Sequence, residues 1–148
     1  MTILGAVVSL LLAGVAFSPT AGAAVKAYGC PGNQIDSYPV TTPGGARWGT
    51  TYLYYSSANA GTNCVVTVDT YWGQDVTKYM YTHIGICPEG QSGCPHEVTD
   101  IDQGYFTWYA GPASLTKTNG RCIQITGTIL SPDGKTRAIS VTGRTHCG

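Results

Sequence analysis

The sequence predicts an all-β fold, a single antiparallel β-sandwich or barrel-like domain stabilised by disulfides. Short runs of β-branched and aromatic residues recur along the chain between glycine-rich turns, and helix-forming residues are scarce after residue 25. Evenly spaced strands without intervening helices are typical of antiparallel sandwiches and barrels. The 148 residues are enough for one such domain with a substantial core.

Residues 1–23 are predicted to be a secretory signal peptide. Ile3–Phe17 is an uncharged run of apolar and small residues, and Ala21-Gly22-Ala23 matches a signal-peptidase site. The run is shorter than the roughly 20 residues of a membrane-spanning helix. Because no Lys or Arg precedes it, an uncleaved anchor and a misplaced start codon remain open alternatives. The mature domain is then 24–148, secreted and free of the membrane after cleavage.

The cysteines are expected to form three disulfides, because an even number of cysteines in an exported chain indicates disulfides before metal sites. Cys87 and Cys94 bracket a polar, turn-rich segment that closes easily on itself. Cys122 begins one predicted strand and Cys147 ends the next, so a hairpin brings them close. The remaining pair completes the set, which comprises Cys30, Cys64, Cys87, Cys94, Cys122 and Cys147.

Four runs in the middle of the chain are predicted strands. Thr50–Tyr55 is rich in threonine and tyrosine. In Cys64–Asp69 and Lys78–Ile86 residues alternate with a period of two, as in half-buried strands. Gln103–Ala110 follows, and Pro112 beyond it lacks an amide donor, so a bend, an edge or a bulge is expected there. The two faces of the third run hold Met80, Ile84 and Ile86 on one side and Tyr79, Tyr81 and His83 on the other.

The last part of the chain is predicted to be a β-hairpin. Ile123–Leu130 leads into a turn at Ser131–Lys135, and a strand with Ile139 and Val141 returns. Placing the two ends of the turn opposite each other aligns Ile125 with Val141. The apolar residues of both strands then lie on one side, as a consistent register requires.

Charge and ligand spacing argue against several kinds of partner. Eight basic and eight acidic residues give a net charge of zero, and only 11% of the chain is charged. Nucleic-acid binding is therefore not expected, because it depends on a basic surface. The three histidines, His83, His96 and His146, do not have the spacing of a zinc site. Asp100 and Asp102 resemble a fragment of a calcium loop but are better explained as an Asp-rich turn entering a strand, so no metal or cofactor is predicted.

No catalytic residues are predicted, since the chain has no Gly-x-Ser-x-Gly nucleophile motif. An enzyme would need a pocket in which a histidine, a carboxylate and a hydroxyl converge. The Cys87–Cys94 loop has two interpretations. It is either the constrained loop of an extracellular protease inhibitor or a disulfide-closed surface turn that its glycines make flexible.

Aromatic residues are the strongest candidates for ligand binding. Ten tyrosines and three tryptophans are present, and exposed rings can form a platform for sugar rings. The candidate residues are Tyr52, Tyr54, Trp108 and Tyr109. The alternative is that these rings pack on half-buried strand faces. The candidate partners are a cell-wall glycan or a surface protein.

Four segments carry a resemblance to a known family. These are Tyr52–Ser56, Gly61–Val68 with its Asn-Cys-Val-Val element, Asp102–Pro112 with Tyr-Ala-Gly-Pro, and Gly120–Ile123. In their order and spacing they resemble the spore-associated protein A family, small secreted actinobacterial proteins that end in Cys-Gly, as Cys147-Gly148 does here. Related modules occur at the C-terminus of some bacterial Ser/Thr kinases. The Cys87–Cys94 loop departs from the common four-cysteine pattern. The resemblance implies a non-enzymatic protein at the spore or cell surface.

Overall fold

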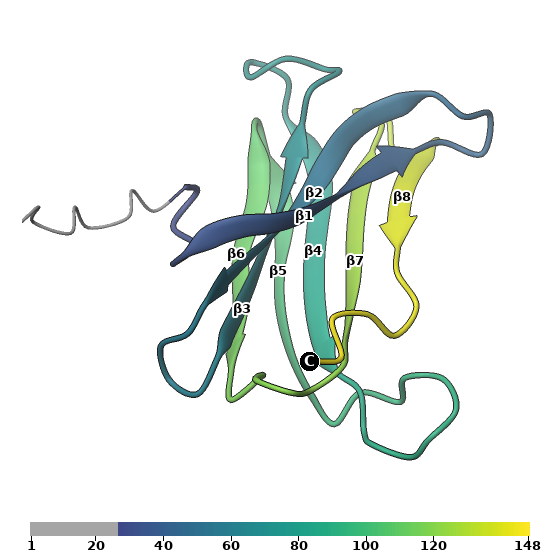
Figure 1. The fold of residues 1–148 in the computed structure, drawn as a ribbon. Helices are drawn as coiled ribbons and strands as arrows, with labels where there is room; N and C mark the ends of the chain where they lie inside the picture. Colours follow the sequence, from purple (N-terminus) through teal and green to yellow (C-terminus); the bar gives the residue numbers. More distant parts are fainter. Residues whose placement is uncertain (1–26) are drawn as a thin grey trace, which may run out of the picture.

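The computed structural model describes residues 27–148, and these form the all-β fold that the sequence predicts (Figure 1). The predicted signal peptide and the start of the domain at residue 24 lie outside the described residues. Within residues 27–148 no helix is long and apolar enough to cross a membrane. The strands are β1 (Asn33–Thr41), β2 (Arg47–Ser56), β3 (Thr62–Asp69), β4 (Lys78–Ile86), β5 (Val98–Phe106), β6 (Tyr109–Thr116), β7 (Ile123–Leu130) and β8 (Arg137–Val141).

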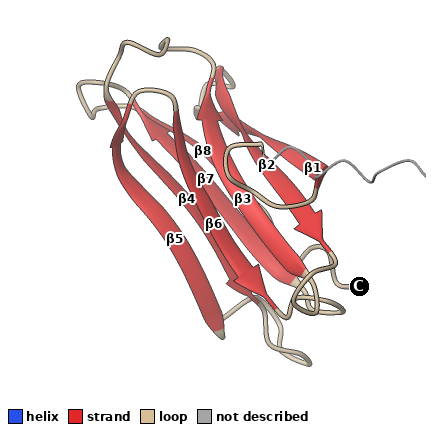
Figure 2. Cartoon of the chain, turned by 90° about the vertical axis from the view of Figure 1, so that its left-hand side faces the viewer, coloured by secondary structure: helices blue, strands red, loops and turns tan. Residues whose placement is uncertain are grey.

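All eight strands belong to one antiparallel sheet that curls into a nearly closed barrel (Figures 1 and 2). The strand order is β5-β4-β7-β8-β1-β2-β3-β6. Two seams interrupt the backbone pairing. β8 meets β1 through the single pair Ile139 and Thr41. β5 and β6 are the two edge strands of the sheet; they contact each other, but no ladder of backbone hydrogen bonds joins these described strands.

Two carboxylates close the seam between β5 and β6. The Oδ2 atom of Asp102 accepts a hydrogen bond from the Gly111 amide at 2.6 Å, and Oδ2 of Asp100 accepts one from the Ser114 amide at 2.8 Å. The prediction that Asp100 and Asp102 form a turn is therefore wrong, because both lie within β5. Their side chains replace the missing ladder with hydrogen bonds to the backbone of β6.

Removing one of these carboxylates should open the seam. We expect Asp102→Ala to lower the free energy of unfolding by about 2 kcal/mol, because it leaves the Gly111 amide without its charged acceptor. Urea unfolding monitored by circular dichroism measures this. Asp102→Asn keeps an acceptor oxygen and should lose less than half as much, so equal losses for the two variants would contradict a role in seam closure.

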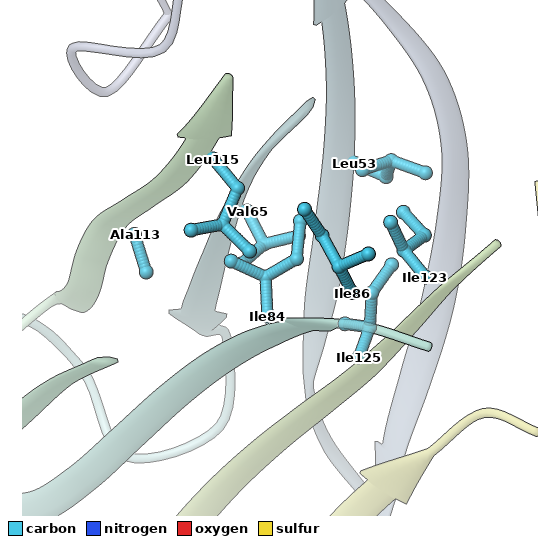
Figure 3. Packing of buried hydrophobic residues seen from close by; sticks show 8 residues of the cluster. All are labelled: Leu53, Val65, Ile84, Ile86, Ala113, Leu115, Ile123 and Ile125. Atoms are coloured by element: carbon cyan, nitrogen blue, oxygen red, sulfur yellow. The ribbon is translucent and has the colours of Figure 1, made fainter. Parts of the chain in front are cut away.

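The core lies inside the barrel and consists mainly of aliphatic residues from β2, β3, β4, β6 and β7. Figure 3 shows the cluster at its centre, formed by Leu53, Val65, Ile84, Ile86, Ala113, Leu115, Ile123 and Ile125. A second cluster contains Val40, Trp48, Met80, Ala110, Ile129 and Ala138. The faces of β4 are as predicted, since Met80, Ile84 and Ile86 belong to these clusters.

Strand β3 is buried on both faces, so the prediction of a half-buried strand is wrong. Val65 packs in the central cluster, while Cys64, Val66 and Val68 lie on the opposite face. That outer face is covered by Tyr54 and by the segment around Cys30. The N-terminal segment thus supplies a cover that strand periodicity alone does not reveal.

The β7–β8 hairpin is shifted by one residue from the predicted register. Val141 pairs with Thr126 rather than Ile125, because the Ser131 amide bonds to the Thr136 carbonyl and lengthens the turn. Val141 is consequently 58% exposed. The inner position goes to Ser140, whose hydroxyl lies 2.9 Å from that of buried Thr51.

One further strand prediction needs correction, and one strand was missed. Gln103–Ala110 is not one strand, because β5 ends at Phe106 and β6 begins at Tyr109. Gly111 and Pro112 fall in edge strand β6 opposite a register irregularity in β3, in agreement with the expected edge or bulge. Strand β1 was not predicted; Pro39 interrupts its pattern, and a strand with one largely unpaired side tolerates proline.

The disulfides of the described residues join Cys30 to Cys64, Cys87 to Cys94 and Cys122 to Cys147, the pairs expected from the sequence. No cysteine among residues 27–148 is free. The C-terminal segment reaches Cys122 by curling back, since Thr145 forms a bridge with Ile123.

Candidate functional site

The four candidate ligand-binding residues come together around a fifth ring, that of Tyr28. Tyr28 stacks on Tyr52 with ring centroids 6.4 Å apart, and it meets Trp108 and Tyr109 edge to face at 5.6 and 5.2 Å. Tyr54 packs in the same group of side chains. We call Tyr28, Tyr52, Tyr54, Trp108 and Tyr109 the aromatic cluster.

The members of the aromatic cluster differ in what they offer to a ligand. Tyr54 is only 5% exposed and forms the buried base of the cluster, as the packing interpretation expects. Trp108 is 40% exposed, and the other three rings are half-buried. An open depression of about 340 Å³ lies beside Trp108 and Tyr109. The cluster therefore presents one exposed indole braced by tyrosine rings.

A disulfide holds Tyr28 at the centre of this cluster. The chain turns between Ala27 and Cys30, with the Cys30 amide donating to the Ala27 carbonyl at 3.0 Å. Cys30 is bonded to Cys64 in β3, two residues before Val66 in the outer face of that strand. Tyr28 was one of the ten tyrosines considered from the sequence but not one of the four selected candidates, although its position two residues before a cysteine paired with a strand was the available signal.

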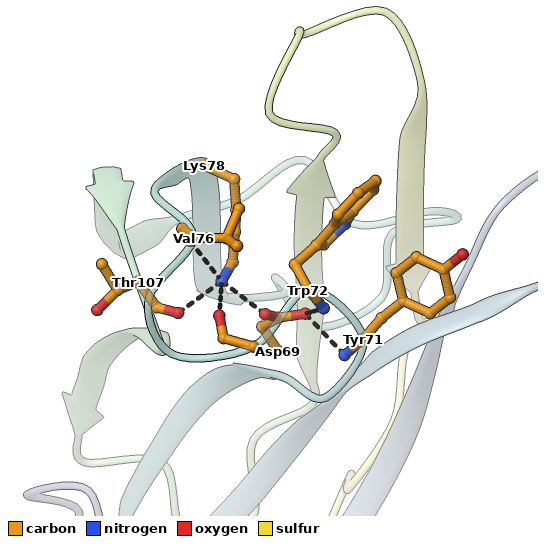
Figure 4. A network of polar contacts seen from close by, with 7 residues as sticks. Asp69, Tyr71, Trp72, Val76, Lys78 and Thr107 are labelled. Carbon is orange, nitrogen blue, oxygen red and sulfur yellow. Dashed lines mark hydrogen bonds and ion pairs between the residues drawn. The ribbon is translucent and has the colours of Figure 1, made fainter.

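A buried ion pair holds the backbone next to Trp108 (Figure 4). The Nζ atom of Lys78 lies 2.5 Å from Oδ2 of Asp69, and the two side chains are 0% and 1% exposed. Nζ also donates to the carbonyl of Thr107 at 2.5 Å, while the Asp69 amide donates to the Trp108 carbonyl at 2.9 Å. The pair therefore fixes the turn between β5 and β6 that carries the exposed indole.

The same pair organises the loop between β3 and β4. Lys78 Nζ donates to the carbonyls of Gly73 and Val76 at 3.2 and 3.0 Å. Oδ1 of Asp69 accepts from the amides of Tyr71 and Trp72 at 3.0 and 3.2 Å. Sequence reasoning missed this pair, but strand parity could have placed both charges inside, because Asp69 follows Val65 and Thr67 and Lys78 precedes Met80.

A histidine, a carboxylate and a hydroxyl do converge elsewhere in the fold. The Tyr38 hydroxyl donates to Oδ2 of Asp36 at 2.8 Å, and Nε2 of His146 lies 3.1 Å from both oxygens. Burial raises the pKa of Tyr38 to about 12, helped by its bond to Asp36. The pKa of Asp36 is below its ordinary value. Burial alone would raise this pKa, but the hydrogen bonds from Tyr38, Ser37 and His146 lower it by more. His146 lines a pocket of about 430 Å³.

The other two histidines lie together on the outer face of β4. The rings of His83 and His96 are 4.6 Å apart, and Nε2 of His96 lies 2.7 Å from Oε1 of Gln124. Gly85 makes room for the His96 ring, because a Cβ atom there would collide with it. Residues 27–148 contain no group of three or more His, Cys, Asp or Glu side chains placed to hold a metal ion.

Burial of His83 should make the stability of the fold depend on pH. Desolvation first, and His96 second, lower its pKa below the ordinary value. In the unfolded chain the imidazole takes up a proton below about pH 6.5, whereas in the folded protein it takes up a proton only at lower pH. We therefore expect the free energy of unfolding to fall between pH 7.5 and 5.5, measured by urea unfolding. His83→Gln should show a shallower dependence, and an unchanged slope would contradict this cause.

The Cys87–Cys94 loop is exposed, and three of its backbone carbonyls converge on Arg144. Nη1 of Arg144 donates to the carbonyls of Pro88, Gln91 and Gly93 at 2.8, 3.3 and 3.1 Å. Gly93 has a φ of +76°, in the left-handed region. These turns differ from the extended backbone that a substrate-like inhibitor presents to a protease. The inhibitor hypothesis stays a prediction that the loop conformation does not favour.

Comparison with known proteins gave no match, whether to a family model, to a curated protein or to a solved structure.

Proposed function

We propose that this chain is an exported, non-enzymatic protein of the spore or cell surface and that its aromatic cluster binds a cell-wall glycan. Three disulfides in the described residues are compatible with an extracellular location. The sequence resemblance to the spore-associated protein A family supports the surface role. The observation that carries the glycan proposal is the rigidly supported Trp108 ring, 40% exposed among tyrosines.

The chemistry of the cluster fits a neutral polymer. Sugar rings present C–H groups that pack on aromatic faces, and tyrosine hydroxyls supply hydrogen bonds at the rim. Tyr28, Tyr52 and Tyr109 keep such rims within reach of solvent, since all are partly exposed. The depression beside Trp108 is lined by Phe106, Thr107, Tyr109 and Gly111 and by no charged residue of the described chain, as suits an uncharged ligand.

Retention on insoluble glycans tests the proposal. Wild-type protein is incubated with peptidoglycan, chitin and cellulose, and the bound fraction is measured by sedimentation. We expect binding to at least one glycan, and about tenfold weaker binding by Trp108→Ala, since losing one exposed ring contact costs on the order of 1–1.5 kcal/mol.

Tyr105→Ala is the matched control, because Tyr105 is 77% exposed but pairs with Tyr79 outside the aromatic cluster. It should bind as the wild type does. Equal retention of the Trp108→Ala variant, or no retention of the wild type on any of the three materials, would contradict the proposal.

Acid–base catalysis at His146 is a second candidate, supported by the contacts among Asp36, Tyr38 and His146. With Nε2 bonded to the carboxylate, Nδ1 is the nitrogen left to act as a base. Hydrolysis of small esters by the wild type, abolished in His146→Gln, would replace the non-enzymatic proposal; equal background rates would remove this candidate.

A further inference from the structure

A second aromatic group forms a corner at the end of the barrel where β7 turns into β8. The indoles of Trp48 and Trp72 meet at 76° with centroids 5.2 Å apart. Tyr71 stacks on Trp48 at 5.7 Å and is 58% exposed. A pocket of about 420 Å³ lies between these indoles and the β7–β8 loop, which contributes Ser131, Pro132, Asp133 and Thr136.

Hydrogen bonds order the loop side of this pocket. The Ser131 amide donates to the Thr136 carbonyl at 2.8 Å, and the Thr136 amide donates to Oγ of Ser131 at 3.0 Å. Oδ1 of Asp133 accepts from the Ser131 hydroxyl at 2.5 Å and from the Lys135 amide at 3.1 Å. Asp133 is thus held at the rim in one orientation.

The second oxygen of Asp133 is left for a ligand. Its nearest cation is Nζ of Lys135 at 3.9 Å, on a side chain that is 83% exposed. Such an exposed pair contributes little. The hydrogen bond from Ser131, followed by that from the Lys135 amide, lowers the pKa of Asp133, so the carboxylate stays ionised at neutral pH.

We propose that the pocket lined by Trp48, Trp72 and Asp133 binds a small organic ammonium ion. Indole faces attract cations through the negative potential above the ring. Trp48 is only 6% exposed and is stacked on Tyr71, so the half-buried Trp72 ring supplies most of the aromatic surface that a cation can reach. The carboxylate of Asp133 supplies the opposite charge. A neutral sugar would use only the aromatic surface, whereas an alkylammonium group uses both features.

This site is separate from the aromatic cluster, so it does not depend on the proposed glycan function. Trp48 and Trp72 contact Tyr71, while Trp108 contacts Tyr28 and Tyr109. Each function can therefore fail without the other, and Trp108→Ala separates them.

A comparison of choline with 3,3-dimethylbutan-1-ol, its neutral isostere, tests the proposal. Indole N–H signals of the wild type are followed by two-dimensional NMR during each titration. We expect choline to shift the signals of Trp48 or Trp72 and to bind about tenfold more tightly than the neutral alcohol. Equal affinities would mean a merely apolar pocket and would overturn the proposal, as would no shift with choline.

Variants identify the charge that matters. Asp133→Asn keeps the shape and should weaken choline binding about three- to fivefold, the upper range of an exposed ion pair, without changing the affinity for the alcohol. Lys135→Ala removes the competing cation and should bind choline at least as tightly as the wild type. Unchanged choline affinity in Asp133→Asn would overturn the role of the carboxylate. Titration with a trimethyllysine peptide and with phosphatidylcholine vesicles distinguishes a protein side chain from a lipid headgroup as the source of the ammonium ion.

Discussion

Replacing Lys78 by methionine is expected to lower the free energy of unfolding by about 3–5 kcal/mol, because it leaves a buried carboxylate without its counterion. Asp69 is only 1% exposed at its side chain and cannot reach water in the folded state. The carbonyls of Gly73, Val76 and Thr107 lose their shared donor as well. Urea unfolding of the oxidised protein measures the loss.

The double variant Lys78→Met with Asp69→Leu is the control. Removing both charges should recover part of the lost stability, since no isolated charge remains. Recovery stays incomplete because the amides of Tyr71 and Trp72 lose their acceptor. A single Lys78→Met variant within about 1 kcal/mol of the wild type would contradict a central role for the pair, since that is the range of an exposed ion pair.

Removing the disulfide between Cys30 and Cys64 is expected to have the second large effect. We expect Cys30→Ala with Cys64→Ala to cost about 3–4 kcal/mol, because the bond closes a loop of 34 residues in sequence separation. The segment that carries Tyr28 also loses its anchor, so glycan retention should fall as far as it does in Trp108→Ala. Thermal unfolding and the sedimentation assay give the two readouts.

The disulfide between Cys87 and Cys94 provides the comparison. Its sequence separation is 7 residues, so Cys87→Ala with Cys94→Ala should cost only about 2 kcal/mol. Its loop lies outside the aromatic cluster, and glycan retention should not change. Equal loss of retention in both double variants would show that stability, rather than the position of Tyr28, limits binding.

Local sequence patterns predicted the elements whose partners are close along the chain. Alternation placed Met80 and Ile84 of β4 inside the barrel. The turn-rich loop and the hairpin predicted two of the disulfides, and the pair of Cys30 with Cys64 followed only as the remainder. The same reasoning failed in β8, where it assumed that Ile139 and Val141 face inward. The inner positions are taken by Ala138 and Ser140, and Ser140 lies against Gly127 and Thr51, where little room is left for a larger side chain.

The site itself depends on contacts that no local pattern contains. Tyr52 and Trp108 were identified from residue type, but Tyr28 joins them only because a disulfide folds the N-terminal segment over β3. Asp69 and Lys78 meet across the β3–β4 loop, and their partner Thr107 lies 29 residues further along. Such contacts follow from the closure of the whole sheet.

NMR of the three tryptophan indoles during titration with a soluble cell-wall oligosaccharide tests the glycan-binding surface most directly. If the aromatic cluster is the binding surface, the Trp108 signal shifts in a saturable manner, while the signals of Trp48 and Trp72 stay where they are. A Trp108 signal that does not shift at the highest sugar concentration of the titration, or shifts confined to the other two indoles, would contradict the account.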